Sequence, residues 1–401
     1  MIYLDNAATS CPKPQEVVAA VSQALSDVCA NPSRGAYELS LLASRSLLQT
    51  RQAVARLFNI RDASRVVFTL NATYALNFAL KGILRPGMHV VTSSIEHNAL
   101  ARPLATLERQ GVEVTRVPCA SDGTTDPDDI LAAVRPGTGL VAMTHASNVL
   151  GTILPVSEVG PRLRERGVPF LVDSAQTAGT FPIDVEAMGI SLLAISGHKG
   201  LLGPQGVGAL YISPDLQVDT LVEGGTGSRS ESLEQPTTFP ERFEAGTPNS
   251  PGIAGLGAGI SVIEAAGVVA IGEREDALAR RLRGALAGMS TIRVYGPAAT
   301  THASGSIPAV APIVSLAFAG LASGQVARIL DKEFGIAVRA GLQCAPEAHR
   351  VAGTLDTGLV RLSIGYATTE AEIDSAAEAL EKIAGKPSNH WLTEWEKQHA
   401  R

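Results

Sequence analysis

A single lysine, Lys199, comes directly after His198 in the segment SGHKGLLGPQG, which follows an apolar run. No other lysine occurs between Lys81 and Lys332, although arginines are frequent over the same span. An apolar setting lowers the pKa of a lysine, and the neutral amine is the form that makes imines. Lys199 is therefore a candidate for covalent chemistry with a carbonyl group.

Other polar side chains also come directly after predicted strands. They are Asp173 and Gln176 after one strand, His145 and Asn148 after a second, His97 after a third, and Ser196 with His198 beside Lys199. Because ligands of parallel α/β sheets bind outside the carboxyl ends of the strands, we expect these side chains on one rim. The set suits pyridoxal phosphate, which needs a lysine, a carboxylate beside its pyridine nitrogen and donors for its phosphate. Thr73, at the start of the predicted helix Ala72–Leu84, is a candidate phosphate donor.

Each of these residues has an ordinary structural explanation when it is taken alone. A lysine after a strand is commonly solvated, an aspartate there is commonly a helix N-cap, and His97 or His145 can be a hydrogen-bonded loop histidine. The free cysteines at positions 11, 29 and 119 fit the interpretation of small buried hydrophobic residues. The set is more specific than its members.

The strands that would position these residues are short and mostly apolar. They are predicted over Val66–Thr69, His89–Ser93, Val112–Pro118, Gly139–Thr144, Phe170–Asp173, Leu192–Ser196 and Gly208–Ile212, with helical segments such as Pro155–Arg166 between them. This alternation favours an α/β fold with a mostly parallel sheet covered by helices. After about Pro251 the pattern changes, and it predicts a smaller α+β domain. Its elements are long helical segments over Gly255–Arg283, a strand at Ile313–Phe318, a helix at Ser323–Phe334, a strand into Arg339 and a last strand at Leu359–Ile364.

Composition narrows the classes of partner. The 401-residue chain is 45% hydrophobic and 18% charged, with a formal net charge of −6 and no basic patch, so no nucleic acid is expected to bind. The opening MIYLDNAATS has no signal-peptide pattern and no apolar run is long enough to span a bilayer, which favours a cytoplasmic protein without membrane contact. The four cysteines have neither metal-ligand nor disulfide spacing, so no metal site is expected.

Eight spaced motifs extend the pattern over residues 2–385. They are YLDNAATS, NPSRGAY, SIEHNA, THASNVLGT, VDSAQTAG, SGHKGLLGPQGVGALY, RFEAGTPN and RAGLQCAPEAH. In this order they resemble the class V aminotransferase family and, within it, the cysteine desulfurases. The resemblance implies a homodimeric pyridoxal phosphate enzyme of fold type I. It also implies a large cofactor-binding domain over residues 16–255, a small domain over residues 1–15 and 256–386, and a C-terminal appendage over residues 387–401.

The resemblance implies a role for each matching position. Lys199 would carry the cofactor, Asp173 would contact the pyridine nitrogen, Gln176 the ring hydroxyl, and His97 would stack on the ring and shuttle protons. Ser196, His198, Thr73 and the backbone at Ala72 would hold the phosphate, together with Thr247 from the second subunit. Asn148 would lie near the ring hydroxyl and the substrate carboxylate, which Arg361 would clamp with its planar guanidinium.

Cys344 distinguishes between the reactions that this cofactor supports. It lies in the loop RAGLQCAPEAH, and in the desulfurases that the chain resembles a cysteine here attacks the sulfur of bound L-cysteine. Alanine would leave, and Cys344 would carry a persulfide for a sulfur-acceptor protein. Arg361 follows Cys344 by only 17 positions, which resembles the group with a compact catalytic loop. We therefore expect slow turnover without an acceptor.

Several alternatives stay open on the sequence. A selenocysteine lyase, acting on L-selenocysteine, would use the same fold and the same cysteine loop. In another class V enzyme, such as an aminotransferase or epimerase, Cys344 would be incidental, and a non-catalytic scaffold would retain the fold alone. Two departures from the family, Asn71-Ala72-Thr73 before the phosphate helix and Ser33 in NPSRGAY, leave open the acceptor and the pathway served, whether iron–sulfur cluster assembly or another branch of sulfur metabolism.

Overall fold

The larger of the β-sheets, called the large sheet below, forms the centre of the molecule. The structure is a computed structural model that describes residues 1–32, 35–298, 310–387 and 390–391. In this part of the chain the large sheet has the order β2-β8-β7-β6-β5-β3-β4. Its strands are β2 (Val66–Thr69), β3 (His89–Ser93), β4 (Glu113–Val117), β5 (Thr138–Thr144), β6 (Phe170–Asp173), β7 (Leu192–Ser196) and β8 (Gly208–Ile212). β6, β7 and β8 are buried along their whole length, which accounts for their almost continuously apolar sequences.

Strand direction brings the ends of the central strands together. β4, β3, β5, β6 and β7 are parallel, whereas β8 is antiparallel to β7 and β2. Thr144 pairs with Asp173, and Asp173 pairs with Ala194. The carboxyl ends of β5, β6 and β7 therefore meet at one edge of the sheet. The predicted mostly parallel α/β fold is confirmed.

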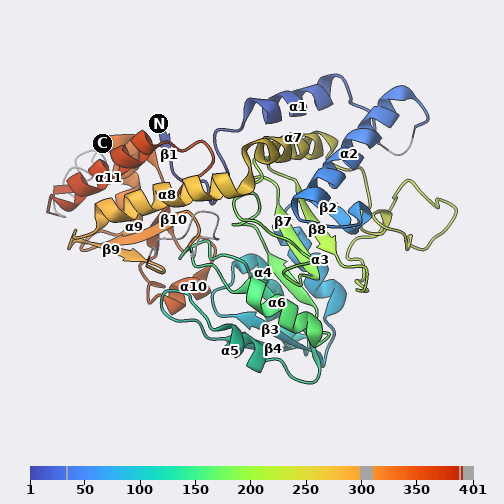
Figure 1. Cartoon of the computed structure of the whole chain (residues 1–401), viewed down its shortest axis with the longest axis horizontal. Coiled ribbons are helices and arrows are strands. Elements are labelled where there is room, and N and C mark those ends of the chain that lie inside the picture. The colour runs from blue at the N-terminus through green and yellow to red at the C-terminus, as the bar shows by residue number, and fades with distance from the viewer. Residues whose placement is uncertain (33–34, 299–309, 388–389, 392–401) are drawn as a thin grey trace, which may run out of the picture.

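Helices cover both faces of the large sheet (Figure 1). They are α2 (Glu38–Leu57), α3 (Ala72–Ile83), α4 (Asn98–Arg109), α5 (Pro127–Ala132), α6 (Val156–Glu165) and α7 (Ser250–Ala266), and α1 (Gln15–Ser26) packs against α7. Successive strand residues point to opposite faces, so Leu192 packs with the cluster that contains α3 and α4. Leu193 packs with the cluster that contains α2, α6 and α7.

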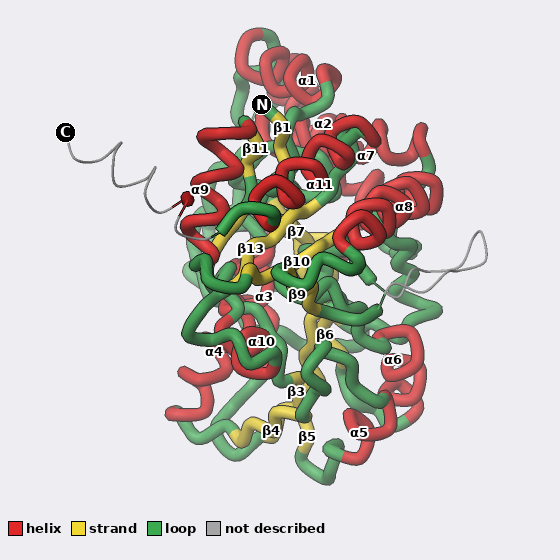
Figure 2. The backbone as a smooth tube through the Cα atoms, turned by 90° about the vertical axis from the view of Figure 1, so that its left-hand side faces the viewer, coloured by secondary structure: helices red, strands yellow, loops and turns green. Residues whose placement is uncertain are grey.

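A second sheet, the small sheet, lies beside the first in space. In the described residues it has the order β12-β13-β10-β9, with antiparallel neighbours. Its strands are β9 (Ile292–Tyr295), β10 (Ile313–Phe318), β12 (Arg339–Gly341) and β13 (Leu359–Ser363), and its helices are α8 (Val268–Leu286), α9 (Ser323–Phe334), α10 (Pro346–Val351) and α11 (Glu370–Ala384). Figure 2 shows this sheet with α8, α9 and α11 around it. Close by, β1 (Ile2–Tyr3) pairs in parallel with β11 (Ile336–Ala337), so the start of the chain lies against its last third.

A sharp bend separates α7 from α8. Gly267 has a φ of 84°, a conformation that glycine adopts without the strain a side chain would cause. α8 then runs from the large sheet towards the small sheet (Figure 1). Among the described residues no single helix is long and apolar enough to cross a membrane; α7 and α8 together meet the test of length and composition but are bent by 81°.

Most predicted elements occur where the sequence indicates them. The segment predicted over Val112–Pro118 is the shorter β4, and the helical passage over Gly255–Arg283 is α7 and α8. The predicted boundary at residue 255 falls inside α7, and the domain limits stay a prediction. Trp391 is buried and its Nε1 donates to Ile383 O at 3.3 Å. Ser33 and Trp395 lie outside the described residues.

Candidate active site

A cavity of about 240 Å³ lies at the carboxyl ends of β5, β6 and β7. Its lining includes Ala72, Thr73, His97, Asn148, Asp173, Gln176, Ser196, His198 and Lys199. The structure thus brings together nine residues that the sequence singles out. Four others, His145, Thr247, Cys344 and Arg361, do not line this cavity.

Lys199 and Asp173 influence one another inside the cavity. Burial lowers the pKa of the Lys199 amine to about 8, and the Asp173 carboxylate partly opposes this shift. Burial raises the pKa of Asp173, whereas a hydrogen bond from Ala175 N at 3.0 Å and the charge of Lys199 lower it. The lowered lysine pKa expected from the sequence is present.

His97 is both a helix cap and a cavity residue. Its Nδ1 accepts a hydrogen bond from Ala99 N at 3.0 Å and so caps the start of α4. Burial, and to a smaller extent the charges of Lys199 and Arg361, lowers the pKa of His97 to about 4. The ring is therefore neutral at pH 7. Because Nδ1 is an acceptor, the single ring proton is on Nε2. The neutral ring is therefore a proton donor at Nε2.

Glu96 is a site residue that the sequence reasoning missed. It is 2% exposed, accepts a hydrogen bond from the Ser93 hydroxyl and accepts another from Thr144 N at 2.9 Å. Burial raises the pKa of Glu96 to about 8, and the nearby Asp173 adds to the shift. The side chain joins the ends of β3 and β5 directly before His97. The available signal was a carboxylate directly before the candidate His97 in SSIEHNAL.

The N-terminus of α3 forms the end of the cavity where Ala72 and Thr73 lie. Asn71 caps this helix, since its Oδ1 accepts from Tyr74 N at 3.1 Å. The cap fixes the first turn with its amide groups towards the helix start, where the dipole favours an anion. Asn71, which belongs to one of the two departures from the family, therefore has a structural role as the cap of this helix.

The N-terminal segment builds another part of the wall, which the sequence did not indicate. The His198 carbonyl accepts hydrogen bonds from Lys13 Nζ at 2.8 Å and from Ser10 Oγ at 3.2 Å. Gln176 Nε2 donates to Ala7 O at 3.1 Å. Burial, followed by the charges of Lys199 and Lys13, lowers the pKa of His198 to about 4. Residues 7–13 thus hold two of the predicted cofactor contacts in place.

Cys344 is exposed and lies beside the element that carries His97. Its carbonyl accepts a hydrogen bond from Asn98 N at 2.9 Å. The Cys344 thiol also affects the pKa of the Lys199 amine, although less than burial, Asp173 and Arg361 do. The thiol is therefore near that amine. The loop of the small sheet therefore reaches the rim of the large sheet.

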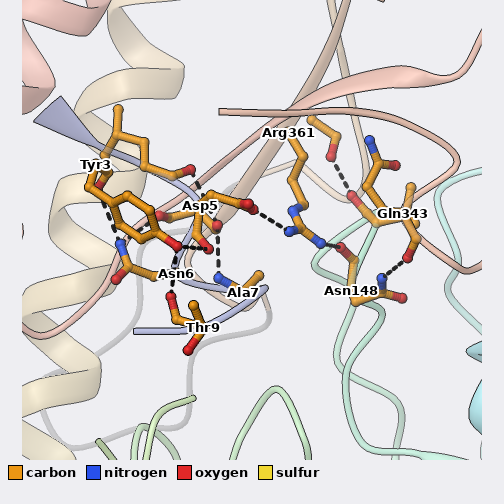
Figure 3. Close-up of polar contacts among 12 residues, drawn as sticks. Tyr3, Asp5, Asn6, Ala7, Thr9, Asn148, Gln343 and Arg361 are labelled. Atoms are coloured by element: carbon orange, nitrogen blue, oxygen red, sulfur yellow. Dashed lines mark hydrogen bonds and ion pairs between the residues drawn. The ribbon is translucent and has the colours of Figure 1, made fainter. Parts of the chain in front are cut away.

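Arg361 is buried at 3% exposure in β13 and connects three parts of the chain (Figure 3). Its Nη2 contacts Asp5 Oδ1 at 2.6 Å, and its Nη1 donates to Asn148 O at 3.1 Å. Its buried Nε has no partner within the described residues. Asn148 Nδ2 in turn donates to Gln343 O at 2.7 Å, so Asn148 connects Arg361 to the backbone of Gln343, the residue before Cys344. Asp5 was missed, although it belongs to the motif YLDNAATS.

Thr247 lies in a different cavity of about 220 Å³, with Phe68, Tyr74 and Phe243 among its lining. The side chains of Leu70 and Val222 also line it and are 49% and 47% exposed. Within one chain Thr247 is therefore apart from Lys199, and its predicted contact requires a second subunit.

Comparisons with known proteins agree over almost the whole chain. The family model of class-V aminotransferases matches residues 2–375. A probable cysteine desulfurase from Methanothermobacter thermautotrophicus is 37% identical over 390 residues, which is 96% of this chain and 95% of that protein. A solved cysteine desulfurase from Thermococcus onnurineus NA1 has a TM-score of 0.89 and 33% identity, covering 96% of this chain and 94% of that one. One from Escherichia coli has a TM-score of 0.83 and 28% identity, covering 95% and 94%. With eight matching motifs and this coverage, the chain belongs to the class-V aminotransferase family.

Proposed function

We propose that this protein is a pyridoxal phosphate-dependent cysteine desulfurase. It converts L-cysteine to L-alanine, and the sulfur passes to Cys344 as a persulfide and then to an acceptor protein. The observation that carries the proposal is one cavity holding both Lys199 and Asp173, next to the loop that presents Cys344. The named relatives and structural neighbours support the same activity.

The donor set of the cavity fits the cofactor. Lys199 would hold its aldehyde carbon and Asp173 its pyridine nitrogen, with Gln176 at the ring hydroxyl. Ser196, His198 and the start of α3 at Ala72 and Thr73 would hold the phosphate, because a helix N-terminus suits an anion. When bound, the cofactor withdraws electrons from the substrate α-carbon.

Proton transfer and orientation fall to the chain itself. The Lys199 amine, with its pKa near 8, can take and return the α-proton at neutral pH. His97, neutral with its single proton on Nε2, can donate a hydrogen bond from that atom to the reacting groups. Arg361 would bind the substrate carboxylate through its planar guanidinium, whose buried Nε has no partner within the described residues.

Sulfur transfer belongs to Cys344. Its thiolate attacks the substrate sulfur, so an S–S bond forms while the C–S bond breaks. The electron pair of the broken bond returns to the substrate, where a proton at carbon completes alanine. The persulfide is left on an exposed residue, which an acceptor protein can reach.

The test uses the protein loaded with pyridoxal phosphate. It is incubated with L-cysteine, the peptide that contains Cys344 is analysed by mass spectrometry, and alanine is measured. We expect one added sulfur atom on that peptide and one alanine for each sulfur transferred. Cys344→Ala should lose both signals while it keeps the absorbance of the bound cofactor. Cys29→Ala, which removes another exposed thiol, is the matched control. Alanine formation at the normal rate by Cys344→Ala would refute sulfur transfer through this residue. Parallel rates on L-selenocysteine separate a lyase specific for selenium.

We further propose a homodimer in which Thr247 completes the phosphate site of the partner subunit. Thr247 lies beside the exposed apolar side chains Leu70, Tyr74 and Val222, a set suited to a covered surface. Sedimentation should give twice the chain mass, and Tyr74→Glu should reduce it. The domain limits given above and the cytoplasmic location stay predictions of the sequence.

A further inference from the structure

The residue that carries the thiol has an unusual backbone conformation. Gln343 and Cys344 both have positive φ, at 42° and 61°, although neither is a glycine. Each such residue costs of order 1–3 kcal/mol and persists only where its surroundings hold it. Two in succession at the proposed nucleophile require a specific restraint.

That restraint is a series of hydrogen bonds between buried side chains in the segment that runs from Gln343 to the start of β13. Gln343 Oε1 lies 2.8 Å from His349 Nε2, and His349 Nδ1 lies 2.9 Å from Thr354 Oγ1. Gln343 Nε2 donates to Leu359 O, the first residue of β13, at 2.8 Å. His349 is fully buried, and Gln343 and Thr354 are 7% and 2% exposed.

The directions of these hydrogen bonds follow from the chemistry of the groups. Since the Gln343 amide nitrogen donates to Leu359 O, its Oε1 must accept from His349 Nε2. His349 Nδ1 is then an acceptor, and the Thr354 hydroxyl is its donor. Burial lowers the pKa of His349, which keeps the ring in this neutral form. Every member of the chain thus has one compatible arrangement.

We propose that the Gln343–His349–Thr354 chain is a positioning device that holds the strained backbone at Cys344 and so sets the direction of its Sγ atom before substrate binds. None of the three side chains lines the 240 Å³ cavity, so they act through Cys344. The bond to Leu359 also ties the thiol loop to the strand that carries Arg361, two residues later. The short segment between Cys344 and Arg361 is therefore held rigid. The Cys344 thiol and the Arg361 guanidinium keep their relative positions. Its catalytic consequence rests on the proposed desulfurase function, but the restraint itself does not.

The most informative pair of substitutions is at Thr354, ten residues after Cys344. Thr354→Val keeps the shape and removes the donor to His349 Nδ1, whereas Thr354→Ser keeps the hydroxyl. In cofactor-free protein we expect hydrogen exchange at the amides of residues 342–345 to be at least about tenfold faster in Thr354→Val, because a buried acceptor loses its partner. Thr354→Ser should exchange as the wild type does.

In the loaded enzyme, Thr354→Val should lower kcat for persulfide formation by roughly 10²-fold, the cost of misplacing a reacting group by about 1 Å. The KM for L-cysteine should stay unchanged, because Arg361 and Lys199 are untouched. Gln343→Met provides a second route to the same effects if Thr354→Val fails to fold.

Wild-type exchange and wild-type kcat in both disruptive variants would overturn the proposal. Equal losses in Thr354→Ser and Thr354→Val would overturn it too, since the hydroxyl would then be immaterial. If the wild-type enzyme makes no alanine, the proposed function fails, while the exchange comparison still decides whether the chain holds the loop.

Discussion

The rim of the large sheet and the loop of the small sheet hold their functional residues in different ways. Asp173 and Ser196 are the last residues of buried strands, so the hydrogen-bond ladder of the sheet places them. Cys344 lies between two short elements and depends on side chains such as Gln343 and His349. A sheet edge is positioned by main-chain bonds that any suitable apolar sequence makes. A loop needs particular side chains, and one substitution can release it.

The largest effect is expected at the sheet rim. Lys199→Ala removes the amine that we propose holds the cofactor and moves the α-proton, so alanine formation should fall by at least about 10³-fold. The absorbance of a borohydride-reduced cofactor bound to the chain should also disappear. The control is Lys81→Ala, which changes an exposed lysine of α3. Retained reducible cofactor in Lys199→Ala would show that the rim does not carry this chemistry.

The next test addresses the side-chain bonds near the loop. Asp5→Asn leaves the buried Arg361 without its carboxylate, and we expect a loss of about 3 kcal/mol in the free energy of unfolding in urea. Asp374→Asn breaks a pair of similar geometry whose members are both about half exposed, and it should change little. Equal losses of unfolding free energy in the two variants would show that the buried Asp5–Arg361 pair stabilises the protein no more than an exposed pair does.

A pH series examines the rim without mutation. The rate at which cofactor-free protein takes up pyridoxal phosphate should rise up to about pH 8 and then level off, because the Lys199 amine loses its proton near that pH. A lysine with the ordinary pKa of 10.5 would continue to gain rate above pH 8. Asp173→Asn should move the plateau to lower pH, since the carboxylate raises the lysine pKa. A plateau that moves upward in this variant would contradict the assigned electrostatics.

A further test concerns the border between the two regions. Glu275 of α8 is 2% exposed, its Oε2 has no partner within the described residues, and it lines a cavity of about 40 Å³ with Lys199 and Ser363. Burial raises the pKa of Glu275 from 4.5 to about 8, so the folded protein holds a proton that the unfolded chain releases. Its contribution to stability is complete below pH 4.5 and is lost as pH rises through 8.

Glu275→Gln removes this titration. Relative to the wild type, the variant should therefore gain stability between pH 5 and pH 9, as measured by urea midpoints. The exposed Glu16→Gln is the control. A difference between Glu275→Gln and the wild type that does not change with pH would rule out the titration.

The sequence was a good guide to the rim and a poor one to the loop. β6, β7 and β8 were predicted residue for residue, because fully buried strands are short apolar runs bounded by polar or turn residues. The contacts of Asp5 with Arg361, and of His349 with Gln343, were not predicted. The first joins residues 356 positions apart and the second depends on side-chain direction in a loop, and neither leaves a periodic signal.

The contact between Asp5 and Arg361 also bears on the order of events during synthesis. The strands of the large sheet are complete in the chain by Ile212, so that sheet can form while the rest is still being made. Asp5 leaves the ribosome before the strands of the large sheet, whereas its partner Arg361 leaves after them. The contact between the two is therefore made after the sheet can form, and a nascent chain has the cavity of Lys199 before it has the arginine that would bind a substrate carboxylate.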